Sequence, residues 1–400
     1  MHFGNSLGGG VSGEDIWARS SIDAFRELGR TVLISYTLLE TLDIYQAIPK
    51  LISRVIIDRI EVDQCVGYGR PAKLRLEDFA KGRARNMTDE EMLRWELQSE
   101  AAEEGSSWGF KVLENQDAFE RGGCIRREGY PQGIPLWKIF SFHFWQGPGH
   151  PLGRNWTLSP EDYKKHPCQN GSPGNFYLGY SVEKYCQRFV DPPEQRLHRA
   201  YILAKYVHIL DSDEFAWDSP NKTLFADLSE KYNISFVAGA DHQGDVSIQK
   251  GIANMGRMPE DEFYKELALG RLVVGVGMPM ISPTPYDALC LGVPFLNPLW
   301  RWDEKNPADS SAWCSNHSGL LEVGAPYVYH VRKRDLAHFE EAVAAAMERT
   351  IDPYIPPHMT ADANRKRHQE LLERDWESES VPFMAALQDD RFQMVRCVVL

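Results

Sequence analysis

The chain of 400 residues is about twice the length of one ordinary domain, so two packed domains are the first expectation. Hydrophobic residues make up 43% of the chain and charged residues 25%, a composition that is typical of globular proteins and excludes predominant disorder. The net charge of −13 repels phosphate backbones, so nucleic acid is excluded as the expected partner.

The first part of the chain shows alternating helical and extended patterns. Apolar residues recur on one helical face over 14–28 and a short apolar run follows at 31–35, which predicts a helix and then a strand. A second helix is predicted at 38–51, followed by an extended segment at 55–66 that is rich in Ile and Val. Residues 71–125 are strongly charged, and we interpret them as an insertion on the first domain.

Residues 131–181 are dense in aromatic residues, Gly and Pro, which favours loops packed under aromatic side chains. The predicted domain boundary is Asp191-Pro192-Pro193-Glu194, because paired prolines end a helix and stiffen a crossing. Beyond it, short apolar runs lie at 207–210, 234–237, 272–276, 293–296 and 327–331. They alternate with helices predicted at 223–232, 260–267, 285–291 and 334–349. This alternation predicts a parallel sheet with helices on both faces.

Six Asn-x-Ser/Thr sequons occur where the composition predicts about one by chance. They begin at Asn86, Asn155, Asn170, Asn221, Asn233 and Asn316. A glycosylated asparagine needs a surface position in an oxidising lumen, so the count favours the secretory pathway over coincidence in a cytosolic protein. The seven cysteines show no zinc-type spacing, and their odd number leaves at least one unpaired.

Two glycine-rich segments precede predicted helices. Residues 8–13 contain four glycines, which let the backbone approach a ligand closely. Glu14 follows in the first helical turn, where the helix dipole favours an ionised carboxylate. Residues 275–279 follow an apolar run and lead into the helix that carries Asp287. A strand, a glycine turn and a helix N-terminus form a site for a diphosphate, and Asp287 could accept hydrogen bonds from a ribose. The first segment could instead be a flexible start with a favourable carboxylate at the helix N-terminus, and the second could be a glycine turn that serves packing alone.

The order and spacing of several motifs resemble glycosyltransferase family 18, the alpha-1,6-mannosylglycoprotein 6-beta-N-acetylglucosaminyltransferases of the Golgi. The motifs are GGGVSGE, HPLGRNWTLSPEDY, PGNFYLGYSVE, GVGMPMISPTPYDALCLGVPFLNP and IDPYIPPHMT. The resemblance implies an α/β protein of GT-B type, with two Rossmann-like domains facing across a cleft. Its expected parts are an acceptor-side domain at 1–192, a nucleotide-sugar domain at 193–370 and a helical tail at 371–400.

The resemblance also implies an activity. It is inverting, metal-independent transfer of N-acetylglucosamine from UDP-GlcNAc to a mannose hydroxyl of an N-glycan, with no cofactor besides the donor substrate. The expected partners are a nucleotide sugar and a glycan or glycoprotein. The expected location is the Golgi lumen, with a membrane anchor only outside this chain, since no apolar run here approaches 18 residues.

Carried over by position, the family's GGxxGE loop makes Glu14 the general base that deprotonates the acceptor hydroxyl. The substrate-binding residues implied by the same resemblance are Gly9, Gly10, Gly13, Lys205, Asn254, Met255, Gly256, Pro279, Asp287 and His317. One departure is that Ile281 stands where the family has a glutamate, which weakens the expected recognition of the donor sugar. A family lysine also has no clear counterpart, and Lys305 is the nearest basic residue.

Two alternatives remain open at this point. Asp211 and Asp213 follow an apolar run, and an Asp-x-Asp after a strand is how metal-dependent transferases hold Mn²⁺ against a diphosphate. The second alternative is a catalytically inert glycan-binding homologue, motivated by Ile281 and by the aromatic residues of 131–181.

Overall fold

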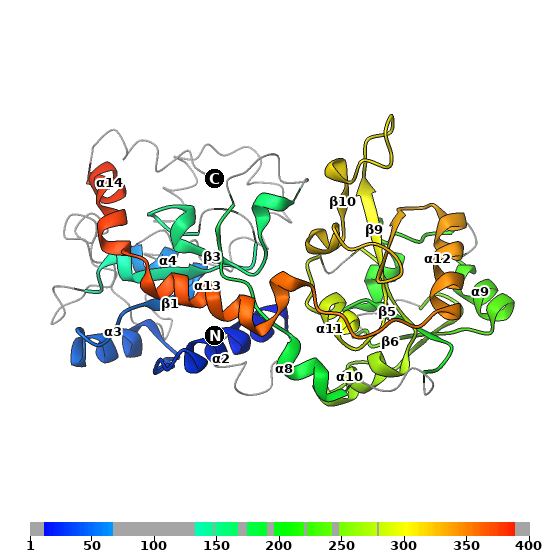
Figure 1. The fold of residues 1–400 in the computed structure, drawn as a ribbon, viewed down its shortest axis with the longest axis horizontal. Helices are drawn as coiled ribbons and strands as arrows, with labels where there is room; N and C mark the ends of the chain where they lie inside the picture. The colour runs from blue at the N-terminus through cyan, green and yellow to red at the C-terminus, as the bar shows by residue number, and fades with distance from the viewer. Residues whose placement is uncertain are drawn as a thin grey trace, which may run out of the picture.

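Two parallel sheets, each in its own lobe, organise the molecule (Figure 1). The computed structural model describes residues 12–66, 133–145, 147, 149–166, 174–189, 196–219, 222–241, 248–277 and 280–388. The insertion predicted at 71–125 and the boundary predicted at 191–194 lie outside the described residues. The predicted α/β class with two Rossmann-like domains is confirmed.

The first sheet combines one strand from the segment predicted as extended, 55–66, with three strands from the region predicted as loops, 131–181. Its strands have the order β1-β2-β3-β4 and are all parallel. They are β1 (Val55–Asp58), β2 (Ile139–Phe142), β3 (Thr157–Ser159) and β4 (Phe176–Tyr177). The prediction of loops over 131–181 was therefore wrong for these three strands. Strands of two to four residues that are buried on both faces, such as Ile139-Phe140-Ser141-Phe142, lack the alternation that marks a strand in a sequence.

Two further predictions in the first lobe were wrong in part. Residues 31–35 form no strand; they are exposed or half-buried and pair with no strand among the described residues. The segment predicted as extended over 55–66 turns into helix α4 (Arg59–Val66) after β1. Asp58 Oδ1 accepts from the N–H of Ile60, and Glu61 Oε2 accepts from the N–H of Asp58, so these two carboxylates start the helix.

The predicted first helix is α2 (Gly13–Glu27), and it begins with a reciprocal cap. Ser12 Oγ accepts from the N–H of Asp15 at 3.1 Å, while Asp15 Oδ2 accepts from the N–H of Ser12 at 3.3 Å. The apolar face of the helix is buried, with Trp17 fully inaccessible. The predicted second helix is α3 (Leu38–Ala47), four residues shorter than expected.

The second sheet has seven strands in the order β10-β9-β8-β5-β6-β7, with β11 also paired to β9, and only β10 runs antiparallel. The strands are β5 (Arg199–Leu203), β6 (Ser235–Ala238), β7 (Ile252–Asn254), β8 (Leu272–Gly275), β9 (Phe295–Arg301), β10 (Cys314–Ser315) and β11 (Val328–Arg332). The helices are α9 (Leu224–Tyr232), α10 (Glu260–Leu269), α11 (Thr284–Cys290) and α12 (Leu336–Glu348). Residues 207–210, expected as a strand, form a 3-10 turn, Val207–Asp211, that follows β5.

The chain returns to the first lobe at its C-terminal end, in helices α13 (Ala361–Glu373) and α14 (Trp376–Gln388) (Figure 1). Asn364 Nδ2 of α13 donates to Ser20 Oγ of α2 at 3.1 Å. Arg54 donates to three carbonyl oxygens near the end of α13, those of Leu371, Leu372 and Arg374. The segment that packs on the first lobe thus begins at 361, before the boundary expected at 370.

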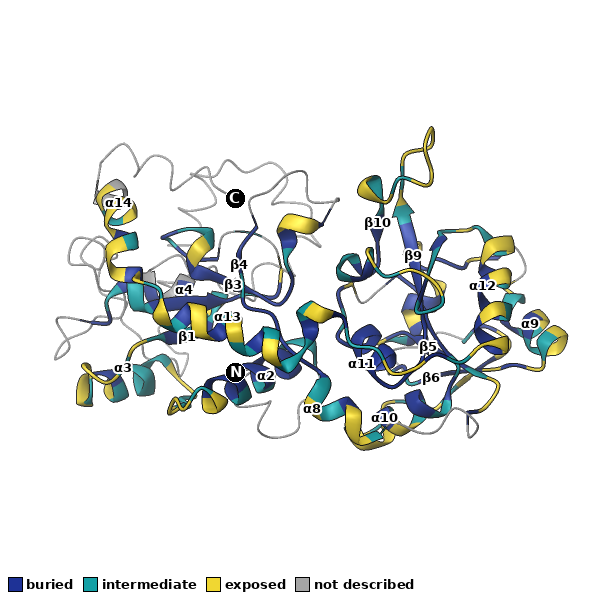
Figure 2. Cartoon of the chain, viewed as in Figure 1, coloured by how far each residue is buried: buried dark blue, intermediate teal, exposed yellow. Residues whose placement is uncertain are grey.

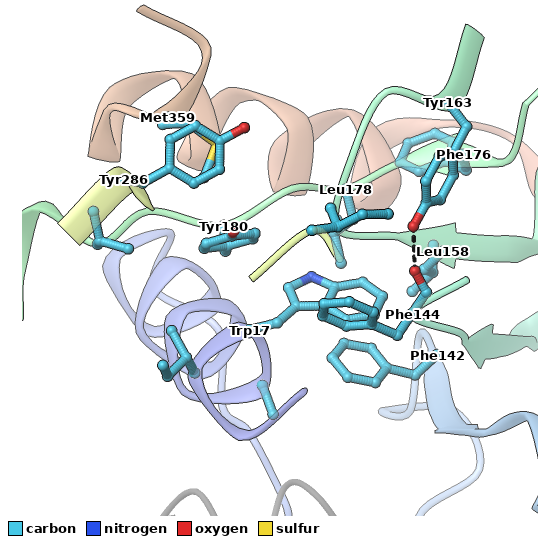
Figure 3. Close-up of a cluster of buried hydrophobic side chains, with 14 of the residues drawn as sticks. Trp17, Phe142, Phe144, Leu158, Tyr163, Phe176, Leu178, Tyr180, Tyr286 and Met359 are labelled. Atoms are coloured by element: carbon cyan, nitrogen blue, oxygen red, sulfur yellow. Dashed lines mark hydrogen bonds between the residues drawn. The ribbon is translucent and has the colours of Figure 1, made fainter. Parts of the chain in front are cut away.

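Buried residues lie in the interior of both lobes (Figure 2), and one cluster of buried apolar residues contains members from each lobe. One apolar cluster contains residues of the first lobe, such as Trp17 and Phe142, together with Tyr286 of α11 in the second (Figure 3). Helix α8 (Glu183–Cys186) joins the lobes covalently, because Cys186 forms a disulfide with Cys290 of α11. Packing and a covalent bond therefore both fix the position of α11 relative to the first lobe.

The cysteines and sequons bear on the compartment. Besides Cys186 and Cys290, Cys65 and Cys314 are disulfide-bonded, which fits an oxidising compartment. Of the sequon asparagines, Asn155 and Asn233 are exposed, whereas Asn316 is buried and inaccessible to glycosylation. Within the described ranges, no helix is both long and apolar enough to span a membrane.

Candidate functional site

The start of helix α2 lies where the two lobes meet. A Cβ atom added at Gly13 would lie 3.1 Å from the ring of Phe144, which follows β2, and 3.3 Å from Cδ of Pro283, which precedes α11. The backbone at Gly13 is therefore packed between both lobes, and a side chain there would push them apart. The next residue, Glu14, is half-buried, and no described residue pairs with its carboxylate. The Glu14 carboxylate therefore has no partner among the described residues, and it directly follows Gly13, the residue that packs against the second lobe.

The second lobe presents a topological switch point. From β5 the chain adds β6 and β7 on one side, whereas β8 and β9 lie on the other side of β5. In parallel sheets, ligands bind outside the carboxyl ends of the strands at such a point. Lys205 follows the end of β5 and is exposed, and Gly277 follows the end of β8. Two predicted elements of the donor site, Lys205 and the glycine turn, therefore flank the switch point.

The described residues between β8 and α11, Gly277 and 280–283, which we call the donor loop, are held by two consecutive residues. Asn316 Oδ1 accepts from the N–H of Gly277 at 2.8 Å, and the carbonyl oxygen of Asn316 accepts from the N–H of Ile281 at 3.1 Å. His317 Nε2 lies 2.9 Å from the carbonyl oxygen of Ser282. These N–H groups are thus engaged within the protein, and the loop is braced from one side.

Ile281, which stands where the resemblance implies a glutamate, also has an unusual backbone conformation. Its φ is +57°, a left-handed conformation that is unusual for a β-branched residue. Its side chain is only 5% exposed and belongs to the apolar cluster between the lobes. Ile281 therefore packs into the apolar interior. A glutamate at this position would place a polar side chain in the same apolar surroundings. Strained backbone of this kind is concentrated at functional sites.

Asp287 was expected to accept hydrogen bonds from a ribose, but the structure buries it. Its side chain is 1% exposed, and Oδ1 accepts from the hydroxyl of Tyr264 on α10 at 3.0 Å. Burial raises the pKa of the Asp287 carboxyl to about 8. In this conformation the carboxyl binds α10 to α11 and does not face a ligand, so that part of the expectation is corrected.

The three residues predicted beside the base of the nucleotide lie together at the end of β7, with Asn254 as its last residue. Asn254 uses its whole amide within the protein: Oδ1 accepts from the N–H groups of Ala240 and Gly256, and Nδ2 donates to the carbonyl oxygen of Ala240. Met255 is 42% exposed, and a Cβ atom at Gly256 would meet nothing within 4 Å. Asn254 therefore braces the turn, while Met255 and Gly256 present the open surface.

His317 is a structural residue in this conformation. It is fully buried, it packs edge-on against Tyr286 at 4.7 Å between ring centroids, and burial lowers its pKa to about 3. Lys305 is exposed on the long loop between β9 and β10. Gly9, Gly10 and Pro279 lie outside the described residues.

The acidic pair does not gather into a metal site. Asp211 is ion-paired with Lys222, and the carbonyl oxygen of Asp213 accepts from Lys333 Nζ at 2.5 Å. Among the described residues, no group of three or more His, Cys, Asp or Glu side chains has the geometry to hold a metal ion. The turn that carries Asp211 is also 3-10, so the expected strand before the pair is absent.

Two contacts between the lobes escaped the sequence analysis. Arg19 of α2 forms a two-point ion pair with Glu260 of α10, and its guanidinium lies 4.0 Å from the ring centroid of Tyr185. Glu161, after β3, accepts from the hydroxyl of Tyr286 with both carboxylate oxygens at 3.2 Å. Both pairs join residues more than 100 positions apart, which no local pattern connects.

Buried titratable groups give the fold a pH dependence of stability. Burial lowers the pKa of six histidines strongly, to about 3 for His150, His317 and His368 and to about 4 for His143, His166 and His358. Burial also lowers the pKa of His330. Burial also raises the pKa of the Glu161 and Asp287 carboxyls to about 8. The histidines favour unfolding as pH falls below about 6.5, and the carboxyls favour it as pH rises toward 8.

We therefore expect the melting temperature to be highest near neutral pH, at about pH 7, because the six histidines dominate below it and the two carboxyls above it. The measurement is thermal unfolding from pH 4 to pH 9. Asp287→Asn, which cannot ionise, should flatten the decline above pH 7. A melting temperature that rises steadily up to pH 9 would contradict the assignment of buried, neutral carboxyls.

Comparison with known proteins connects this geometry to one family. The sequence profile described as glycosyltransferase family 18 matches residues 151–385, more than half of the chain. The chain is 26% identical over 245 residues to human alpha-1,6-mannosylglycoprotein 6-beta-N-acetylglucosaminyltransferase A, covering 57% of this chain and 31% of that protein. It is 22% identical over 232 residues to the human B enzyme, covering 55% of this chain and 28% of that protein. The chain thus spans about a third or less of these relatives.

A nematode relative and several solved structures add to the comparison. The chain is 24% identical over 241 residues to the Caenorhabditis elegans enzyme, covering 58% of this chain and 33% of that protein. A UDP-GlcNAc 2-epimerase from Neisseria meningitidis covers 48% of this chain at 12% identity, with a TM-score of 0.30. The spinosyn rhamnosyltransferase SpnG covers 54% at 16% identity, with a TM-score of 0.27. On the profile match, the chain belongs to glycosyltransferase family 18.

Proposed function

We propose that this chain is the catalytic region of an inverting glycosyltransferase that moves N-acetylglucosamine from UDP-GlcNAc to a mannose hydroxyl of an N-glycan. The observation that carries the proposal is the contact of Gly13 with Pro283, which brings the start of α2 against the donor loop. Glu14 then lies at the junction where a donor held by the second lobe would meet an acceptor held by the first. The acceptor class and the sugar follow the names of the relatives.

Each of the gathered residues has a role in this reaction. A sugar hydroxyl is a weak nucleophile, and the Glu14 carboxylate takes its proton as the new bond to the anomeric carbon forms. The bond from that carbon to the diphosphate breaks at the same time, so UDP leaves with the electron pair. Lys205, exposed beside the switch point, offers positive charge to the departing diphosphate. Met255 and the backbone of Gly256 offer a surface to the planar base.

The proposed location is the lumen of the secretory pathway, in the Golgi. The disulfide between Cys186 and Cys290 and the bonded state of Cys65 and Cys314 support an oxidising compartment. The relatives are named for action on mannosylglycoproteins, which are substrates of that pathway.

Transfer is expected to proceed without a divalent metal. The reason is that Lys205 supplies the positive charge at the diphosphate that a metal would otherwise supply. The Asp211 carboxylate is already paired with Lys222. The measurement is transfer from UDP-GlcNAc to a mannose-terminated N-glycan in EDTA. Loss of turnover in EDTA that Mn²⁺ restores and Asp213→Asn blocks would support the metal-dependent alternative. Glycan binding with no turnover under any of these conditions would support the inert homologue.

A further inference from the structure

A buried hydrogen bond joins the first lobe to α11, the helix that follows the donor loop. Glu161 extends from the carboxyl end of β3 in the first lobe and is 1% exposed; Tyr286 of α11 in the second lobe is fully buried. The tyrosine hydroxyl donates to the carboxyl group, 3.2 Å from each of its oxygens. The same hydroxyl also lies 3.5 Å from Nε2 of His358. Loss of the tyrosine hydroxyl would leave the buried Glu161 carboxyl without this hydrogen bond, which is costly.

A third element is shaped around this pair. A Cβ atom added at Gly319 would lie 2.2 Å from the hydroxyl oxygen of Tyr286 and 2.6 Å from Oε2 of Glu161, so only glycine leaves room for the bond. Gly319 follows His317 by two residues, in the segment that braces the donor loop. The segment that contains His317 and Gly319 therefore packs directly against the hydrogen bond between Glu161 and Tyr286.

The pair connects to the donor loop through His317. The Tyr286 ring packs edge-on against the His317 ring at 4.7 Å between centroids, and His317 Nε2 lies 2.9 Å from the carbonyl oxygen of Ser282. Ser282 precedes Pro283, which contacts Gly13 beside Glu14. Contacts therefore run from Glu161 in the first lobe through the donor loop and back to the first lobe at Glu14.

We propose that Glu161 is a positioning residue for the transfer reaction: by holding Tyr286, it fixes the donor loop relative to Glu14. This inference rests on the proposed function. Among the described residues, the side-chain hydrogen bonds of Glu161 go to Tyr286, so its effect on the reaction passes through Tyr286 and His317. A displacement of about 1 Å between reacting groups can cost about 10²-fold in rate, so a bond that sets the distance between lobes affects turnover.

The charge state of Glu161 selects the best test variant. Burial raises the pKa of its carboxyl to about 8, and the groups that face it are Tyr163, Tyr177, Tyr180, Tyr286, Asp162 and Arg367. Near neutral pH the group is mostly uncharged, and glutamine reproduces its shape, its charge and an oxygen that accepts from Tyr286. Alanine removes the bond, and Tyr286→Phe removes it from the other side without a change of shape.

The experiment compares steady-state transfer in Glu161→Ala, Glu161→Gln, Tyr286→Phe and the double variant Glu161→Ala/Tyr286→Phe. We expect kcat to fall about 10²-fold in Glu161→Ala and Tyr286→Phe. The double variant should lose no more than either single one, because both remove the same bond. Glu161→Gln should keep at least about half of kcat. The Kd of UDP should stay within about twofold throughout, since the residues proposed to hold UDP, Lys205, Met255 and Gly256, all belong to the second lobe.

Tyr264→Phe is a matched control, because Tyr264 donates to the buried Asp287 carboxyl but both residues belong to the second lobe. It should lower the melting temperature and leave kcat within about twofold. Equal losses of kcat in Tyr264→Phe and Tyr286→Phe would overturn the positioning role, as would a Glu161→Ala variant with unchanged kcat.

A second readout separates this inference from the proposed function. The N–H of Ile281, in the donor loop, donates to the carbonyl oxygen of Asn316. Its hydrogen exchange should become faster in Tyr286→Phe and not in Glu161→Gln or Tyr264→Phe. Absence of transfer in the wild type would refute the proposed function, and the exchange rates would still test the positioning. Unchanged exchange in Tyr286→Phe would refute the positioning while transfer persists.

Discussion

Glu14→Gln is expected to lower kcat for transfer by about 10²- to 10⁴-fold and to leave UDP affinity nearly unchanged. Glutamine keeps the shape of the side chain and removes only its capacity to accept a proton. The measurement is steady-state transfer from UDP-GlcNAc together with calorimetric titration of UDP. The two readouts separate the loss of the base from the loss of the donor site.

The geometry around Glu14 explains why the substitution should act on chemistry alone. The cap of α2 is formed by Ser12 and Asp15, so Glu14 is not needed to start the helix. Its carboxylate pairs with no residue of the described chain, so its loss should break no internal contact. Glu14→Gln should therefore leave the melting temperature within about 2 °C of the wild type.

Glu27→Gln is the matched control for this prediction. Glu27 belongs to the same helix, at the opposite end, and its side chain is exposed. It should transfer at the wild-type rate. If Glu14→Gln kept more than about half of the wild-type kcat, the assignment of the general base would fail. Equal losses in both variants would point to a change in the helix and not to a missing base.

The sequence predicted the elements whose pattern is local and long. The apolar face of α2 repeats with helical spacing and ends beside Leu28 and Gly29, so its limits were close to those observed. The alternation over 223–349 likewise predicted β6, β8, α9, α10 and α12. It could not predict β3 and β4, because strands of three and two residues are defined by their neighbours in the sheet.

For the site, position along the chain was predicted better than burial. The resemblance led to the donor loop and the start of α2, and the structure brings these together at Gly13 and Pro283. Glu14 and Gly13 precede the residues that the family profile matches, so this contact is an independent reason to group them. Asp287 was misjudged because one helix turn decides whether a carboxyl faces solvent or Tyr264, and a sequence does not show that rotation.

The contact between lobes also explains why Ile281 is tolerated. In this chain the donor loop is held by hydrogen bonds to Asn316 and His317, and the His317 ring packs against the Tyr286 ring. An apolar side chain at 281 extends the cluster between the lobes, whereas a carboxylate there would have to be buried at considerable cost. The position has thus become part of the packing that joins the lobes.

Trp17→Ala is expected to lower the free energy of unfolding by about 3 to 5 kcal/mol. Trp17 is fully buried on α2, one turn from Glu14, and its ring stacks on Phe142 of β2 with centroids 3.5 Å apart and planes 18° apart (Figure 3). Phe144 lies against its edge at 6.4 Å. Alanine would leave a cavity between the helix and the first sheet, which the surrounding rings can fill only in part.

Two further substitutions make the measurement specific. Trp145→Ala removes an indole that is 44% exposed and should cost at most about 0.5 kcal/mol. Trp17→Phe keeps an aromatic ring against Phe142 and removes a buried indole N–H that has no hydrogen-bond partner among the described residues. It should therefore cost less than half as much as Trp17→Ala. Urea unfolding of the three variants gives the comparison, and equal midpoints for Trp17→Ala and Trp145→Ala would show that α2 is not held by this stack. Because the stack fixes the helix that carries Glu14, Trp17→Ala should also lower kcat at temperatures where the variant is still folded, and Trp17→Phe should restore most of it.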